Sequence, residues 1–139
     1  MPKKRNKPGT RSPKIRLFIV CEGKADKSDS AYFKSFIKSC IFAGERVEVK
    51  VIDTKKNTGK ELVEEAIKSK EFPQDVAWVV YDKDGYTKHP ETFDFANKNR
   101  ISIGFSAISF EYWILLHYKY TSKPFIKSED VIKYMKDNN

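Results

Sequence analysis

The chain has 139 residues, a length that suits one domain with a single hydrophobic core. Charged residues make up 33% and hydrophobic residues 40% of it, which is typical of soluble globular proteins, and no apolar run approaches the roughly 20 residues of a membrane-spanning helix. The basic N-terminus continues into polar residues and prolines, so the pattern of a secretory signal peptide is absent as well. We therefore expect a cytoplasmic protein with no membrane partner.

The net charge of +8 is concentrated at the N-terminus. Residues 1–14 hold 6 of the 27 basic residues and no acid, and the rest of the chain has 21 basic against 19 acidic residues, a balance of +2. Prolines and a glycine in this segment predict a basic tail that is disordered on its own. Two roles stay open for it, solubility and attraction of a nucleic-acid phosphate backbone. The second role makes Lys3, Lys4 and Arg5 candidate nucleic-acid contacts.

Hydrophobic patterning predicts strands that alternate with helices along the chain. Runs rich in β-branched and aromatic residues predict four strands, at residues 15–21, 47–51, 76–81 and 101–105. Helical spacing predicts helices from residue 32 to near Gly44, from a capping box of Thr58 and Glu61 onward, at 90–99, at 110–118, and in a last short segment capped by Ser128. We expect the dense apolar helix at 110–118 to lie in the core.

This alternation predicts an α/β fold over a single domain of residues 15–139. Strands joined by helices pair in parallel through right-handed crossovers, which gives a parallel four-stranded sheet of order about 2-1-3-4 with helices on both faces. In such sheets ligands bind beyond the carboxyl ends of the strands, where the winding direction reverses. Here the reversal lies between the first and third strands, which end in Glu22 and in Asp82 and Asp84.

The three acids should therefore meet at one edge of the sheet. Carboxylates brought together repel one another, and a hard divalent cation with oxygen ligands, Mg²⁺ or Mn²⁺, removes that conflict. Such an ion keeps positions for water and phosphate oxygens, which fits phosphodiester cleavage or phosphoryl transfer. Asp82 and Asp84 followed by Gly85 are also ordinary turn residues, so a purely structural role remains the alternative.

Three segments together resemble the RloB-like proteins, a Toprim-like group associated with bacterial restriction and phage-defence loci. These segments are Phe18–Gly23, Val79–Asp84 and Phe110–His117. The resemblance implies a Toprim-like fold in which Glu22, Asp82 and Asp84 hold Mg²⁺ for cleaving or joining phosphodiesters. An acid stands before a Tyr-Phe pair in the family's first motif, and Asp29 occupies that place here.

The chain departs from the family pattern in three places. The loop between Glu22 and Tyr32 is longer than usual, and the family's Ser-Asn-Pro is replaced by Ser106, Ala107 and Ile108. Family members normally continue past the last helix, so we expect this domain to be truncated at its C-terminus or to be a degenerate member.

Two further charged residues lie near the predicted acidic edge. Glu111 opens the helix at 110–118, where it is either a further catalytic residue, as a ligand or proton shuttle, or a charge that complements the helix N-terminus. Lys24 follows Glu22 in the loop and is either a phosphate contact or a solvated lysine.

The first functional hypothesis is a Mg²⁺-dependent Toprim-like nuclease, a phosphodiester hydrolase that acts on DNA or RNA in a restriction or abortive-infection locus. Its catalytic residues would be Glu22, Asp82, Asp84 and Glu111. The alternative is a catalytically inactive module that binds nucleic acid or a partner ATPase, since little outside the tail is basic. A response-regulator receiver fits less well, because the order of the acids differs and a later strand-end lysine is missing.

Overall fold

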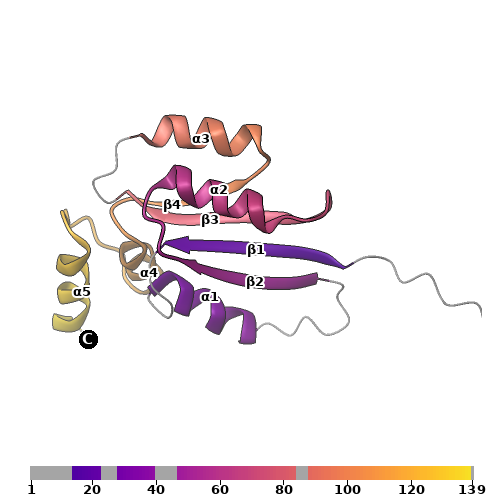
Figure 1. Ribbon diagram of the computed structural model, residues 1–139. Helices are drawn as coiled ribbons and strands as arrows, with labels where there is room; N and C mark the ends of the chain where they lie inside the picture. The colour runs from indigo at the N-terminus through magenta and orange to yellow at the C-terminus, as the bar shows by residue number, and fades with distance from the viewer. Residues whose placement is uncertain (1–13, 23–27, 40–46, 84–87, 139) are drawn as a thin grey trace, which may run out of the picture.

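A computed structural model describes residues 14–22, 28–39, 47–83 and 88–138 of the chain. In these ranges four parallel strands form one sheet in the order β2-β1-β3-β4 (Figure 1). The strands are β1 (Ile15–Glu22), β2 (Val47–Thr54), β3 (Val76–Asp82) and β4 (Ser102–Ser106). The predicted α/β class, the parallel pairing and the strand order are all confirmed.

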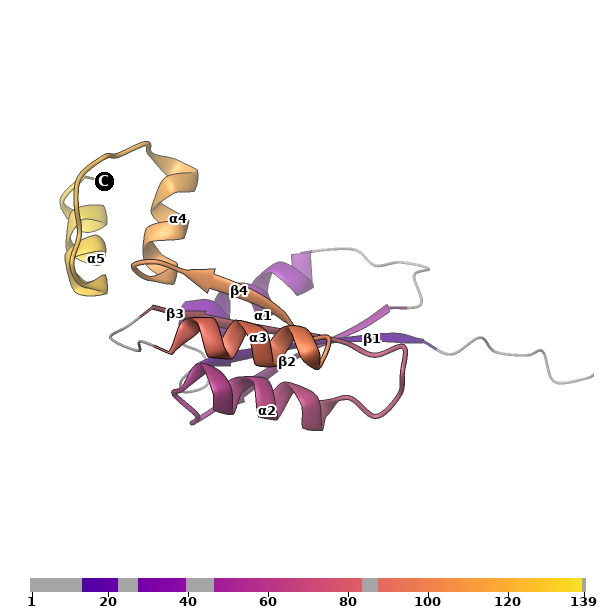
Figure 2. The same ribbon diagram turned by 90° about the horizontal axis from the view of Figure 1, so that it is seen from above.

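Five helices occur in the described ranges. They are α1 (Ser28–Ser39), α2 (Gly59–Ser69), α3 (His89–Lys98), α4 (Phe110–Tyr118) and α5 (Ser128–Asp137). Helices α2 and α3 cover one face of the sheet and α1 covers the other, whereas α4 and α5 lie beyond the carboxyl ends of the strands (Figures 1 and 2). None of the helices in the described ranges is long and apolar enough to cross a membrane.

Local signals placed most helix ends to within a residue, except at the start of α1. The capping box at α2 is confirmed, because the Glu61 N–H donates to Thr58 Oγ1 at 3.3 Å and the Thr58 backbone N–H donates to the Glu61 carboxylate. The Thr58 hydroxyl also donates to Glu61 Oε2, at 2.9 Å. Ser128 is the first helical residue of α5 and not its cap, a shift of one residue. Helix α1 begins at Ser28, four residues before the predicted start at residue 32, because its polar first turn lacks the apolar spacing on which the prediction depends. It is described to Ser39, so the predicted end near Gly44 lies outside the described residues.

The hydrophobic core occupies both faces of the sheet. Successive residues of a strand point to opposite faces, so Val79 packs under α2 and α3 while Val80 packs on the α1 side. Leu62 and Val63 of α2 are completely buried against the first of these faces. Cys21 is a buried free thiol, and burial together with the charges of nearby acids raises its pKa to about 12. The thiol therefore stays protonated at neutral pH and is a poor nucleophile.

Helix α4 corrects the expectation that its whole apolar run lies in the core. Phe110 and Leu115 are buried, but Trp113 is 40% exposed and Leu116 is 42% exposed. The reason is the position of α4 beyond the strand ends, where it contacts the end of β4, α1 on one side and α5 on the other without lying across the sheet. Only part of the apolar surface of α4 is therefore buried.

A buried ion pair closes the opposite end of the sheet. The Arg16 guanidinium donates to both carboxylate oxygens of Asp75, at 3.1 Å from Nε and 2.6 Å from Nη2. The backbone N–H groups of Glu71 and Phe72 also donate to Asp75, each at 2.9 Å. The hydrogen bond from Arg16 is the largest of the effects that hold the pKa of Asp75 well below its usual range.

We predict that Asp75→Asn lowers the unfolding midpoint at pH 7 by several degrees, because the Arg16 charge loses its buried partner and keeps only the exposed carboxylate of Glu71, at 3.0 Å. A carboxyl whose pKa is lowered on folding stabilises the fold above its unfolded pKa of about 3.9, and that contribution is lost as the pH falls further. The difference between the wild type and the variant should therefore shrink below pH 4. Thermal unfolding at pH 7 and pH 3 checks this, with the exposed Asp94→Asn as control; a difference that does not depend on pH would contradict it.

Candidate active site

Two acids lie at the carboxyl ends of neighbouring strands. Glu22 is the last residue of β1 and Asp82 is the last residue of β3, and the two strands are hydrogen-bonded in parallel with Cys21 level with Val80. The sheet order therefore brings Glu22 and Asp82 to one edge, as the sequence predicted. Asp84, the third predicted ligand, lies outside the described residues.

Asp82 has the most unusual environment of these acids. Burial raises its pKa first, and the negative charges of Asp29, Glu111 and Glu22 raise it further, to about 7. The backbone N–H of Phe110 donates a hydrogen bond to the carboxylate and opposes this rise. The Oδ1 atom of Asp82 is buried and has no hydrogen-bond partner in the described part of the chain. A buried oxygen acceptor with no donor is costly, so this atom is suited to receive a ligand.

Asp29 belongs to the same group of acids. It stands in the first turn of α1, where burial and then the charge of Glu111 raise its pKa to about 6, against a hydrogen bond from its own backbone N–H. Sequence reasoning placed Asp29 in the family motif but not among the site residues. The sequence signal that could have identified Asp29 as a site residue is its position in the first turn of the helix that follows β1, near the carboxyl end of that strand.

Glu111 reaches this group from the first turn of α4. Its charge raises the pKa of both Asp29 and Asp82, so it lies within electrostatic range of two other acids. Both readings of this residue therefore have a structural basis: it is an acid of the helix first turn, and it is also a neighbour of the acidic group. We call Glu22, Asp29, Asp82 and Glu111 the acidic group from here on.

The acidic group fits a divalent cation by its chemistry. Its potential metal ligands are all carboxylate oxygens, and Asp82 Oδ1 has no hydrogen-bond partner among the described residues that an ion would have to displace. No three His, Cys, Asp or Glu side chains within residues 14–22, 28–39, 47–83 and 88–138 stand close enough together to hold one ion. Electrostatic effects on a pKa act over longer distances than metal–oxygen bonds, so the two findings are compatible. Binding would require these side chains to converge.

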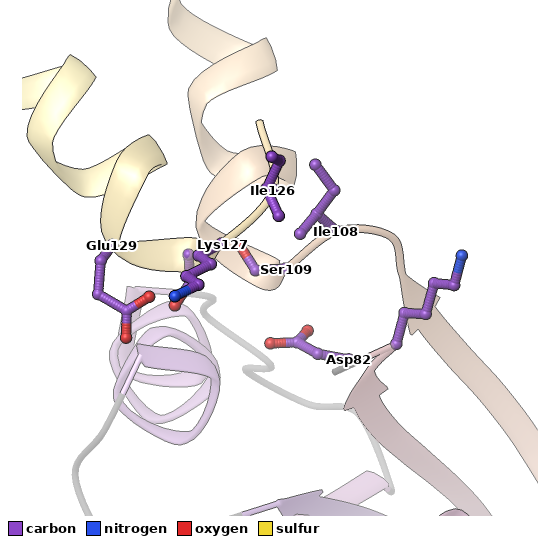
Figure 3. Close-up of a pocket in the computed structure, with 8 residues that line it drawn as sticks. Asp82, Ile108, Ser109, Ile126, Lys127 and Glu129 are labelled. Atoms are coloured by element: carbon purple, nitrogen blue, oxygen red, sulfur yellow. The ribbon is translucent and has the colours of Figure 1, made fainter. Parts of the chain in front are cut away.

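A cavity of about 520 Å³ opens beside Asp82 (Figure 3). It lies between the end of β3, the turn before α4 and the start of α5, and its lining is Asp82, Lys83, Ile108, Ser109, Ile126, Lys127, Ser128 and Glu129. Sequence reasoning missed the residues of α5 in this lining. They belong to no recognised motif, and only the packing of α5 against α4 brings them to the acidic edge.

The predicted nucleic-acid contacts Lys3, Lys4, Arg5 and Lys24 lie outside the described residues. They stay predictions.

Comparison with known proteins gives one match. A protein-family model described as RloB-like protein matches residues 17–139, which is most of the chain and includes every member of the acidic group. No curated protein and no solved structure matches the chain.

Proposed function

The chain belongs to the RloB-like family, and on this premise we propose that it is a Mg²⁺- or Mn²⁺-dependent nuclease of the Toprim-like type. It would cleave phosphodiester bonds of DNA or RNA in the bacterial cytoplasm, as part of a restriction or abortive-infection defence against phage. One observation carries the proposal: at the carboxyl edge of a parallel sheet, Asp82 presents a buried oxygen with no hydrogen-bond partner among the described residues, and the charges of the other three acids raise the pKa of Asp82.

The electrostatics of the acidic group support a cation there. At neutral pH the charges of Asp29, Glu111 and Glu22 oppose ionisation of Asp82, and an added positive charge would favour it. In this proposal Glu22, Asp82 and Asp84 hold the ion, and Glu111 or Glu22 holds or moves a proton. When bound, the ion would neutralise charge on the phosphate and favour ionisation of an attacking water.

The test uses the full chain with end-labelled single-stranded DNA, duplex DNA and single-stranded RNA. We expect cleavage of at least one of them with Mg²⁺ or Mn²⁺. We expect none with EDTA, because EDTA removes the divalent ion that the proposed reaction requires. Isothermal titration with each metal in the absence of nucleic acid measures ion binding separately. Absence of both binding and cleavage would overturn the proposal.

A second function is favoured by the charge distribution. Outside residues 1–14 the balance is only +2, which is a weak electrostatic basis for gripping a duplex. The alternative is therefore an inactive module that binds nucleic acid through its tail or that binds a partner ATPase. Metal binding without cleavage of any substrate would favour this module. Deletion of residues 1–14 followed by binding measurements at several salt concentrations would show the contribution of the tail.

A further inference from the structure

The cavity beside Asp82 lies between the starts of two helices. Helix α5 begins at Ser128, which lines the cavity, and α4 begins at Phe110, directly after the lining residue Ser109 (Figure 3). The first N–H groups of a helix have no partner inside the helix and carry a partial positive charge. In α4 the Phe110 N–H already binds Asp82 and the Tyr112 N–H binds the Ser109 carbonyl oxygen at 3.2 Å. In the turn before α5 the Lys127 N–H binds Asp130 at 3.3 Å. The anion-binding donors are therefore the first-turn N–H groups of α5, whose own acids Glu129 and Asp130 oppose an anion on their side.

Ser109 supplies an independent sign of a ligand. This residue is 3% exposed, it lines the cavity, and its Oγ has no hydrogen-bond partner in the part of the chain that the structure describes. Its side chain points toward the start of α5 (Figure 3). As the residue before α4 it does not use its hydroxyl to cap the helix either. A buried hydroxyl without a partner is costly, so a ligand oxygen at this position would satisfy it.

The charges around the cavity are of both signs. Lys83 and Lys127 are exposed lysines that line it, and Asp82 and Glu129 are its acids. Two lysines, a hydroxyl and helix N-terminal N–H groups suit phosphate oxygens, whereas Asp82 suits the cation that would accompany a phosphate. The carboxylate of Glu129 opposes an anion, which restricts the favourable position to the side of Ser109 and Lys127. The volume of about 520 Å³ also leaves room for the nucleoside attached to a phosphate.

We infer that this cavity is a phosphate-binding subsite, in which Lys127, Ser109 and the start of α5 hold a phosphate group of the nucleic-acid substrate next to the acidic group. The inference rests on the proposed nuclease function and names the part of the protein that grips the substrate. It requires no metal for phosphate binding itself, and this separates its test from the test of cleavage.

The experiment titrates inorganic phosphate into the ¹⁵N-labelled full chain without metal and follows backbone amide signals. We expect saturable shifts at the amides of Ser109, Phe110, Ser128 and Glu129. Lys127→Ala should weaken the binding about tenfold or more, because a charge-assisted hydrogen bond is lost. Ser109→Ala should weaken it by a smaller factor, because a neutral hydrogen bond contributes less. The control is Lys136→Ala, an exposed lysine in the last turn of α5, which should bind as the wild type does.

Two results would overturn the subsite. The first is shifts confined to residues 1–14 and unaffected by Lys127→Ala, which would assign phosphate binding to the basic tail. The second is binding that appears only with Mg²⁺ and is lost in Asp82→Asn, which would assign it to the ion. Phosphate shifts at both helix starts in a protein that neither binds Mg²⁺ nor cleaves nucleic acid would support the subsite and reject the nuclease. Lys127 is exposed, so its variant should fold normally, which the amide spectrum verifies.

Discussion

Asp82→Asn is expected to abolish Mg²⁺-dependent cleavage and to leave the fold intact. The substitution keeps the size of the side chain and an oxygen that can accept the Phe110 N–H, but it removes the charge that would hold the ion. We expect a loss of at least about a hundredfold in rate, since bound metal contributes several kcal/mol of charge stabilisation to phosphoryl chemistry. The double variant with Asp84→Asn should show no more residual activity than the single one.

The same substitution should stabilise the metal-free protein above neutral pH. The pKa of Asp82 is raised on folding to about 7, so its contribution to stability is fully present below its unfolded pKa of about 3.9 and is lost as the pH rises through 7. An Asn side chain does not ionise, so the variant does not lose stability in this pH range. At pH 8 we expect the variant to be more stable by roughly 1 to 2 kcal/mol, a figure that allows for solvent screening of this partly exposed group.

Urea unfolding at pH 5 and pH 8, with and without Mg²⁺, measures these effects. Mg²⁺ should raise the stability of the wild type, because it binds only the folded state, and should not affect Asp82→Asn. Asp94→Asn is the matched control, since Asp94 is an exposed residue of α3 and is not among the acids whose charges raise the pKa of Asp82. Unchanged cleavage by the Asp82 variant, or equal stabilisation of both proteins by Mg²⁺, would reject Asp82 as a metal ligand.

Leu62→Ala should have the largest effect on stability. Leu62 is completely buried in the core between α2 and the sheet, and its truncation leaves a cavity in a close-packed region. Such substitutions cost about 2 to 5 kcal/mol, a large part of the roughly 5 to 15 kcal/mol that stabilise a domain. We therefore expect the midpoint of urea unfolding to fall sharply.

The control for Leu62→Ala is the same substitution at Leu116, which is 42% exposed on α4 and should cost less than about 1 kcal/mol. Any activity lost in Leu62→Ala should return at lower temperature, where the variant is folded, whereas activity lost in Asp82→Asn should not return. Equal destabilisation by the two leucine variants would contradict the assignment of Leu62 to the core.

Much of the sheet was predictable because its signals are local and repeated. The β-branched runs that end at Glu22 and Asp82 mark two strands, and helices between strands leave few topologies that satisfy right-handed crossovers. The meeting of Glu22 and Asp82 at one edge followed from that topology, although these residues are far apart in the chain. The capping box of Thr58 and Glu61 was predictable for the same local reason.

The surroundings of Asp82 were not predictable in this way. The α4 helix was expected in the core because its composition is apolar, yet its place beyond the strand ends leaves Trp113 and Leu116 about 40% exposed. Composition records how much apolar surface a helix has, but the partner that covers it is set by the packing of the whole chain.

The strand order and the position of the acids at the strand ends could therefore be predicted from the sequence alone. The reason is that hydrophobic periodicity and crossover handedness are properties of short segments. Tertiary structure decided three features: the buried Asp82 oxygen that has no hydrogen-bond partner within the described ranges, the inclusion of Asp29, and the cavity that Ser109 and Lys127 line. They depend on where α4 and α5 pack, and that packing rests on contacts such as those among Leu115, Phe125 and Val131, which no local pattern in the chain specifies.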